Sequence, residues 1–162
     1  LMDLTEDLFR GLVRDIAGSE TVTFRGHEID FSKGFRRLPV CDGLREYAGY
    51  EEADFHDPER AVARAREHHI DKDLIAQIQR THAGGSDRDL ALELAMHVFE
   101  EAVEPHLVQP TFVTDFPAVV SPLSRRSDQA APARSRVRIH LVGIGGSGLS
   151  AIAGLLQRTR AA

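Results

Sequence analysis

Cysteine is almost absent from this 162-residue sequence. Cys41 has no second cysteine with which to form an intramolecular disulfide, and no cysteine cluster exists to hold zinc or an iron–sulfur centre. The first seven residues carry three acids and no basic residue, whereas a secretion signal begins with a basic stretch followed by an apolar one. We therefore expect a protein of the reducing cytoplasm.

Long uncharged runs are also scarce. One run, residues 139–156, has the length of a bilayer span, but five of its positions are glycines that bunch as in a loop. We therefore expect no membrane helix and no membrane partner. The eight histidines include no HExxH pairing, so they predict no metal site. No internal repeat is present.

Charge is distributed unevenly along the chain. Residues 121–162 hold seven arginines against one acid, a net charge of +6, which leaves −11 for residues 1–120. The composition changes after Arg126, where small, polar and proline residues follow one another. This pattern predicts three parts: a body over residues 1–126, a linker over 127–136 and a separate tail over 137–162.

The first forty residues predict a helix followed by strands. Apolar residues spaced three or four apart predict an amphipathic helix that Gly18 closes. Two short strands, residues 21–25 and 28–31, flank a Gly-His pair and predict a β-hairpin. Residues 35–40 predict a further extended piece, placed at an edge by its proline.

Helices dominate the next part of the sequence. Asp57 and Pro58 form the start signal of a second helix, and residues 82–86 form a loop. The helix after this loop has the clearest apolar face, and it stops by Glu104 because Pro105 follows. A strand is predicted at residues 111–114. We expect an α+β body in the order helix, hairpin, two helices, strand, with a core that includes Leu4, Leu8, Leu12, Phe24, Ile29, Leu90, Leu94, Val98, Phe112 and Phe116.

Few residues in the body suggest chemistry. Glu100 and Glu104 are four apart and share a helix face, which fits an acid–base pair but better fits a solvated surface. Cys41 has no neighbouring base and is predicted to be a small buried residue. We predict no catalytic residue and no metal ligand in this chain.

The glycine-rich run of the tail is more specific. Residues 143–148 fit the pattern GxGxxG, directly after a predicted strand and directly before a predicted helix. Glycines at these positions let the backbone approach a phosphate, whose charge the helix N-terminus stabilises. The acidic residue that binds the ribose about 20 positions later is missing. The predicted nucleotide or diphosphate loop consists of Gly143, Gly145, Gly146 and Gly148.

Two sequence runs near the end of the body carry a family resemblance. Residues 110–117 read PTFVTDFP, and residues 120–126 read VSPLSRR. Together they closely resemble bacterial class II lysyl-tRNA synthetases. The first run is shared with the aspartyl and asparaginyl relatives, and the second points to the lysine enzyme. The resemblance covers residues 2–126 and is strongest over residues 98–126.

The resemblance implies a partial antiparallel class II synthetase-type sheet with flanking helices. It also implies ATP-dependent activation of lysine, transfer to tRNA, Mg²⁺ as metal cofactor and a homodimer in the parent family. The ATP-binding and metal-binding motifs of that family are missing from this sequence, so we expect a fragment that is inactive alone and binds neither cofactor well. Near the amino-acid pocket the resemblance implies Ser121, Pro122 and Leu123, for which a structural turn is the alternative.

The tail has a resemblance of its own. Residues 137–153 read VRIHLVGIGGSGLSAIA and look like the start of UDP-N-acetylmuramate–alanine ligase, where this loop faces the UDP diphosphate. The resemblance implies a short Rossmann-like β-loop-α unit. Two alternatives to a synthetase fragment follow: a UDP-sugar or nucleotide-binding module of peptidoglycan synthesis, and a non-catalytic interaction module whose basic tail contacts RNA.

Overall fold

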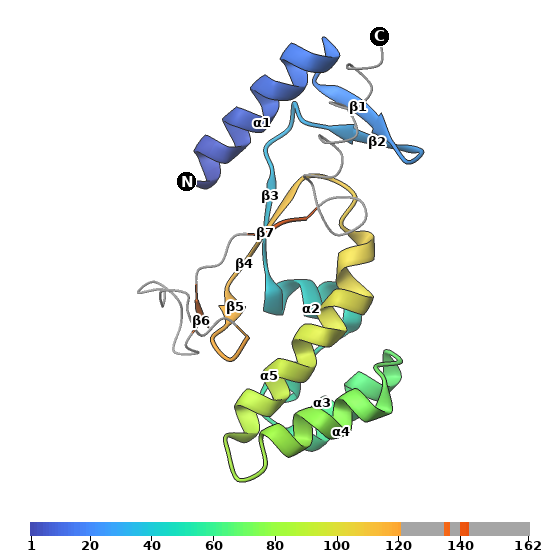
Figure 1. Ribbon diagram of the computed structural model, residues 1–162, viewed down its shortest axis with the longest axis vertical. Helices are drawn as coiled ribbons and strands as arrows, with labels where there is room; N and C mark the ends of the chain where they lie inside the picture. The colour runs from blue at the N-terminus through green and yellow to red at the C-terminus, as the bar shows by residue number, and fades with distance from the viewer. Residues whose placement is uncertain (121–134, 137–139, 143–162) are drawn as a thin grey trace. The chain divides into compact units, whose positions relative to one another are not determined.

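The computed structural model describes residues 1–120, 135–136 and 140–142, which fall into two compact units (Figure 1). The first unit contains residues 1–38 and 105–113 with the strand at 140–142. The second contains residues 39–104 and 114–120 with the strand at 135–136. Both units combine helices with short strands, which confirms the α+β class.

Helix α1 (Met2–Ala17) opens the first unit. It ends at Gly18, whose left-handed backbone (φ 66°) lets its N–H donate to the carbonyl of Arg14. Val13 is buried on the inner face of the helix. The prediction that Leu4 and Leu8 are buried is wrong, because both side chains are exposed. Apolar residues occupy more than one face of this helix, so their spacing alone does not select the face that packs.

The predicted hairpin is confirmed. β1 (Thr21–Phe24) pairs antiparallel with β2 (His27–Asp30), and Val22 lies opposite Ile29. Arg25 and Gly26 form the two-residue connection, and both have positive φ angles of 49° and 82°. Two consecutive positive φ angles are what a type I′ turn requires, and such turns match the twist of the paired strands.

Aromatic side chains fill the core of the first unit. Phe35 lies at the centre, with its ring centroid 5.9 Å from that of Phe31 and 5.4 Å from that of Phe112. Val22 and Ile29 of the hairpin are buried in the same cluster. Met2, Phe9 and Phe24 are only partly buried against it, and Leu12 is half-buried.

A small sheet in the first unit has the order β3-β4-β7. Its strands are β3 (Arg36–Pro39), β4 (Thr111–Thr114) and β7 (His140–Val142). β7 runs antiparallel to β4, with residue 141 opposite Phe112. The sequence places residues 140–142 in a separate unit, whereas the structure pairs them with a strand of the body.

Four helices form the described body of the second unit. In Figure 1, α5 runs alongside α2 at one end and alongside α3 and α4 at the other. Because α5 contacts each of the other three, it forms the spine of this unit, as its buried Leu90, Leu94 and Val98 require. The helices are α2 (Val40–Ala48), α3 (Pro58–Glu67), α4 (Lys72–Thr81) and α5 (Asp87–Val98).

Side-chain caps start three of these helices. The Asp57 carboxylate accepts from the N–H groups of the first turn of α3, as the sequence predicts. Asp71 caps α4 in the same way, and the Ser86 hydroxyl caps α5 by accepting from the N–H of Asp89. Each cap satisfies donors that have no partner inside the helix.

The sequence predicts two helices between residues 57 and 104, whereas the structure has three. The sequence also fails to predict α2. The chain breaks between α3 and α4 because His69 has a positive φ of 62° and Asp71 begins a new helix. Ile70 lies in this break and is buried there. Pro39 is the N-cap residue of α2 and makes no side-chain hydrogen bond there. The sequence therefore carries no capping signal for the start of this helix.

The end of α5 changes its winding. A π-helical segment, Phe99–Val103, continues directly from the α-helix, and a short 3₁₀ turn, Glu104–His106, follows. Phe99 and Val103 are both buried. Further along, β5 (Phe116–Pro117) pairs antiparallel with β6 (Ser135–Arg136). Among the described residues, no helix is long and apolar enough to cross a membrane.

Candidate functional site

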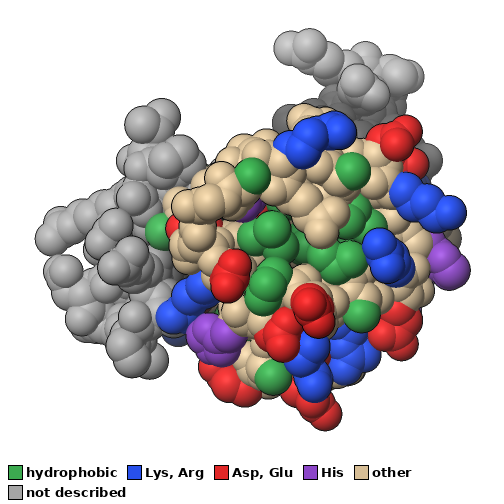
Figure 2. Space-filling model, turned by 90° about the horizontal axis from the view of Figure 1, so that it is seen from below, with side chains coloured by type: hydrophobic (Ala, Val, Ile, Leu, Met, Phe, Trp, Pro, Cys, Tyr) green, Lys and Arg blue, Asp and Glu red, His purple; other side chains and the backbone are tan. Residues whose placement is uncertain are grey.

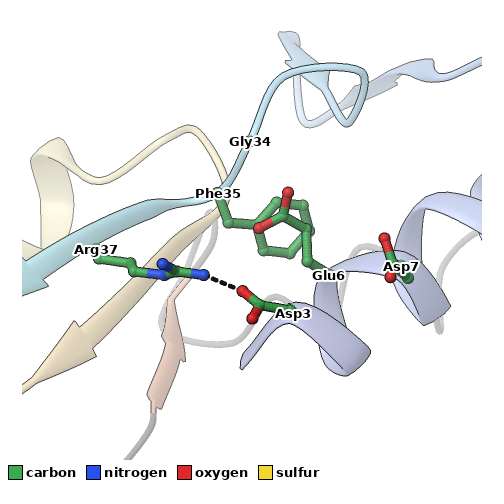
Figure 3. Close-up of a pocket in the computed structure, with 6 residues that line it drawn as sticks. All are labelled: Asp3, Glu6, Asp7, Gly34, Phe35 and Arg37. Carbon is green, nitrogen blue, oxygen red and sulfur yellow. Dashed lines mark hydrogen bonds and ion pairs between the residues drawn. The ribbon is translucent and has the colours of Figure 1, made fainter. Parts of the chain in front are cut away.

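A pocket lies in the first unit between α1 and residues 34–37 (Figure 3). Its volume is about 430 Å³. Asp3, Glu6 and Asp7 project from α1, where their spacing of three and four puts them on one face of the helix. The opposite wall is formed by Gly34, Phe35 and Arg37.

Basic side chains pair the acids of this pocket. Arg37 forms an ion pair with Asp3 across the pocket (Figure 3). Arg10 donates to Glu6 at 2.9 Å, lies 3.6 Å from Asp7 and donates through Nε to the carbonyl of Phe31 at 3.0 Å. The carboxylates therefore already have partners within the chain, which leaves the pocket without a free charge to bind a cation.

Phe35 gives the pocket its apolar wall. The side chain is buried, and its ring lies 6.4 Å from that of Phe9 and 5.4 Å from that of Phe112. These ring contacts tie Phe35 to the core of the unit rather than leaving its face open for stacking. The residues that line the pocket include no serine, cysteine or histidine, so the pocket offers no hydroxyl, thiol or imidazole nucleophile.

A second polar cluster surrounds a buried aspartate of the second unit. Asp54 is 1% exposed and sits in the 3₁₀ turn Glu52–Phe55, between α2 and α3. It accepts from Nε of Arg60 at 2.8 Å, from Nε of Arg64 at 3.1 Å and from the N–H of Glu51 at 2.8 Å. The cluster therefore fastens this turn to the first two turns of α3.

The guanidinium groups have further partners outside the buried carboxylate. Arg60 donates to the Glu51 carboxylate at 2.6 Å, and Arg64 donates to the carbonyl of Gly49 at 2.8 Å. The face shown in Figure 2 likewise carries basic and acidic side chains side by side around an apolar area. Interleaved signs of this kind give no long-range field of one sign over that face.

The pKa of Asp54 reports the balance of forces on this carboxylate. Burial by itself raises the pKa, but the N–H of Glu51 and the guanidinium groups of Arg60 and Arg64 together outweigh it, so the pKa lies below its ordinary value. The side chain is thus held as a buried anion with charged hydrogen bonds on both oxygens. This arrangement is structural, because the carboxylate is buried and both of its oxygens bind groups of the chain itself.

Tyr50 packs beside this cluster. Its ring lies 5.3 Å from that of Phe55, and the guanidinium of Arg64 lies 5.9 Å from its centroid. The hydroxyl is buried and has no hydrogen-bond partner among the described residues. Burial, and then the negative charge of Asp54, raise the pKa of Tyr50 well above its ordinary value.

Histidines and carboxylates do not converge on a metal site in the described residues, where no group of three potential ligands occurs. The histidines instead make pairwise contacts. His82 lies 2.7 Å from the Glu93 carboxylate, and His56 lies 3.1 Å from that of Glu52. The described residues therefore do not fit a bound metal ion.

Residues 1–144 match the family of class II tRNA synthetases for aspartate, lysine and asparagine (D, K and N). The chain belongs to this family. It is 40% identical to a lysine–tRNA ligase of Dichelobacter nodosus over 144 residues, which cover 88% of this chain and 26% of that protein. It is 37% identical to the lysine–tRNA ligase of Actinobacillus succinogenes over 146 residues, which cover 88% of this chain and 26% of that protein.

The lysine–tRNA ligase of Escherichia coli is 36% identical over 131 residues, which cover 79% of this chain and 23% of that protein. The chain thus spans about a quarter of the length of the curated relatives it matches. The predicted membership of the class II synthetase family is confirmed, and the relatives that match at 36–40% identity are lysine–tRNA ligases. The matched residues 1–144 extend past residue 126, where the sequence predicts a linker, so this boundary stays a prediction.

The site residues that the sequence predicts for this synthetase fragment lie outside the described residues. This holds for Ser121, Pro122 and Leu123, and for the glycines of residues 143–148. The structure does describe the strand that leads to the first group. Between β4 and β5, Asp115 has a positive φ of 57°, and its carboxylate lies 3.3 Å from the hydroxyl of Thr114.

Glu100, Glu104 and Cys41 are the other residues for which the sequence suggested chemistry, and their surroundings fit a structural role. Burial, and then the charge of Glu100, raise the pKa of Glu104, which agrees with the predicted proximity of these two acids. Glu100 also lies 3.6 Å from His97. Cys41 is half-buried, and burial raises the pKa of its thiol, which disfavours the reactive thiolate.

Sequence reasoning missed the Asp54 cluster altogether. Arg60 and Arg64 are four apart and share a face of α3, but Asp54 lies in a separate 3₁₀ turn, so no single helical period relates it to them. The only local signal is an aspartate just before a helix whose first two turns carry two arginines. The pocket was missed as well, because it joins α1 to residues more than twenty positions away.

Proposed function

We propose that this chain forms part of a lysine–tRNA ligase, which uses ATP to activate lysine and then transfers the lysyl group to tRNA. The observation that carries the proposal is the identity of 36–40% to proteins named lysine–tRNA ligase over most of the chain. The aspartate and asparagine branches of the same family are the competing assignments.

The chain on its own has no chemistry to perform in this proposal. In this proposal ATP and Mg²⁺ are bound by parts of the ligase that this chain does not match, because the ATP-binding and metal-binding motifs that the resemblance implies are missing from this sequence. What the described residues supply is a scaffold. The core around Phe35 and Phe112 holds β4, and β4 leads toward Ser121.

The amino-acid specificity of this scaffold is tested by a chimaeric enzyme. In the ligase of Dichelobacter nodosus, the matched stretch is replaced by residues 1–144 of this chain, and the charging of tRNA is measured with lysine, aspartate and asparagine. We expect charging with lysine alone. A folded chimaera that charges aspartate or asparagine, or that charges none of the three, contradicts the proposal.

The isolated chain provides the matching control. We expect no lysine-dependent exchange of pyrophosphate into ATP by the purified chain, with the unmodified Dichelobacter nodosus enzyme measured in parallel. Exchange by the isolated chain would overturn its role as a non-catalytic part.

Further features follow from the same proposal. Ser121, Pro122 and Leu123 border the amino-acid pocket of the assembled ligase. The ligase works in the cytoplasm as a homodimer. The body of this chain ends near residue 126, residues 127–136 form a linker whose last two residues lie in β6, and residues 137–162 form a tail whose strand β7 pairs with β4.

A second candidate function concerns that tail. Strand β7 ends directly before Gly143, which supports the strand-then-glycine order that a diphosphate loop needs. In this proposal the Rossmann-like tail binds the diphosphate of a UDP-sugar through Gly143, Gly145, Gly146 and Gly148. Titration of UDP-N-acetylmuramate against the chain and a Gly145→Asp variant tests it. Binding that is absent, or equal in both proteins, contradicts it.

A further inference from the structure

The side chain of Gln109 takes the place of a neighbouring strand along β2. Its Oε1 accepts from the N–H of Asp30 at 3.1 Å, and its Nε2 donates to the carbonyl of Glu28 at 2.8 Å. The N–H of Phe31 donates to the carbonyl of Glu20, which directly precedes β1. Backbone groups of alternate residues point to opposite edges of a strand, so Gln109 occupies the edge of β2 that faces away from β1.

A glutamine side chain suits this position because its amide carries the same donor and acceptor as a peptide group. The backbone cannot do the same here, because the next residue, Pro110, has no N–H with which to extend a ladder. The two hydrogen bonds join parts of the sequence that lie 79 and 81 positions apart. Gln109 therefore links the hairpin to the segment from which β4 starts.

This segment is held at two further points. The Pro110 carbonyl accepts from the N–H of Arg36 in β3 at 3.1 Å. The buried hydroxyl of Thr111 donates to the backbone carbonyl of Gln109 at 2.9 Å. The ladder between β4 and β7 begins at Thr111, so the contacts of residues 109 and 110 hold the start of β4 beyond the end of that ladder.

Packing along β4 couples its start to the residues that follow it. Residues 111–120 are all buried or half-buried. A closely packed segment is hard to compress, so it transmits a shift at one end rather than absorbing it. Ser121 comes directly after this stretch, and in the proposed function it borders the amino-acid pocket.

The hydrogen bonds of Gln109 add little to the stability of the first unit. The side chain is exposed, so water competes for both bonds. Holding a long side chain in one rotamer also costs conformational entropy of a size similar to the gain from those bonds. The contact therefore supplies a fixed position for the segment rather than stability.

We infer that Gln109 is a positioning residue of the proposed ligase, because its amide fixes the start of β4 and, through β4, the residues that border the lysine pocket. This inference rests on the proposed function. It adds to that function a residue that acts on lysine binding without touching the substrate.

The test uses the chimaera with the Dichelobacter nodosus ligase and its variant Gln109→Met, in which a side chain of similar size makes neither hydrogen bond. Lysine-dependent exchange of pyrophosphate into ATP gives the KM for lysine, the KM for ATP and kcat. We expect the KM for lysine to rise about fivefold while the KM for ATP stays unchanged. A defect in folding alone would instead lower kcat through a smaller folded fraction and leave both KM values as they were.

A matched control makes the same substitution at Gln79, an exposed glutamine of α4 whose side chain has no hydrogen-bond partner among the described residues. Gln79→Met should leave both KM values and kcat unchanged. A second variant, Gln109→Glu, keeps the acceptor for Asp30 but loses the donor to Glu28, so it should raise the KM for lysine as well. Urea unfolding of the isolated chain should give the same midpoint with each substitution, because both glutamines are exposed.

Three results overturn the inference while the proposed function stands. They are an unchanged KM for lysine in both Gln109 variants, an equal rise in the KM for ATP, and a loss of kcat with both KM values unchanged. If the unmodified chimaera charges no lysine, the proposed function itself fails, and the inference that rests on it fails with it.

Discussion

Replacing Asp54 by asparagine tests whether the buried cluster fastens the 3₁₀ turn to α3. The substitution keeps the size of the side chain but removes the charge that Arg60 and Arg64 contact. Taking away one partner of a fully buried ion pair costs about 3–5 kcal/mol. Here the arginine side chains are 43% and 23% exposed, so water solvates them once the anion is gone.

This partial exposure lowers the expected cost. Hydrogen bonds to charged groups contribute about 1.5–3 kcal/mol, and asparagine retains one acceptor oxygen. We therefore expect Asp54→Asn to lower the free energy of unfolding by about 2 kcal/mol. With a typical urea dependence for a small protein, this moves the unfolding midpoint by about 1 M.

Urea unfolding followed by circular dichroism measures the effect. The control is Asp42→Asn, which removes a 2.8 Å ion pair with Arg45 between two exposed side chains and should cost less than about 0.5 kcal/mol. Equal costs for Asp54→Asn and Asp42→Asn would refute the reasoning, because burial would then have no effect.

The pH dependence of the same variant follows from the sign of the pKa shift. The pKa of Asp54 is lowered in the folded chain, so its contribution to stability is complete above the unfolded pKa and is lost as the pH falls through the folded one. The difference between the unmodified chain and Asp54→Asn should be full at pH 7 and shrink below about pH 4. A difference that grows on acidification contradicts this.

Four further substitutions test three individual features. Tyr50→Phe removes a buried hydroxyl without a described partner and should raise the free energy of unfolding by about 1 kcal/mol in urea; a decrease would reveal a hydrogen bond. Val13→Ala should cost about 2 kcal/mol in the same assay, whereas Leu4→Ala should cost less than about 0.5 kcal/mol, and the reverse order would contradict the orientation of α1. Asp115→Gly should raise the thermal midpoint, because glycine adopts the positive φ at this position without strain, and a lower midpoint would show that the carboxylate contact outweighs the strain.

Local signals in the sequence predicted the elements that carry them. Asp57 caps its helix as expected, and Gly26 sits in the hairpin turn. The predicted core residues Ile29, Leu94 and Phe112 are buried. These predictions succeeded because each depends on residues that lie close together in the chain.

Features that depend on distant parts of the chain could not be predicted in this way. The face of α1 that packs is chosen by the aromatic core around Phe35 and Phe112, which the helix sequence does not contain. The partners of Asp54 are chosen by how the 3₁₀ turn meets α3. Ser121, Pro122 and Leu123 owed their assignment to the family resemblance, the glycines of residues 143–148 owed theirs to the GxGxxG pattern, and both groups lie outside the described residues.

The π-helical turn Phe99–Val103 affects how this part of the chain tolerates insertions and deletions in its sequence. A π-helical turn arises when one amino acid is added within an α-helix, and the surplus is absorbed as a local bulge. The turns before the bulge keep their angular positions, so α5 still packs against α3. Val103, at the end of the bulge, still faces the interior. Removing a single amino acid here would turn the bulge back into an ordinary α-helical turn and leave the residues downstream on the same faces. The bulge thus preserves the rotational register between α5 and the residues that follow Val103.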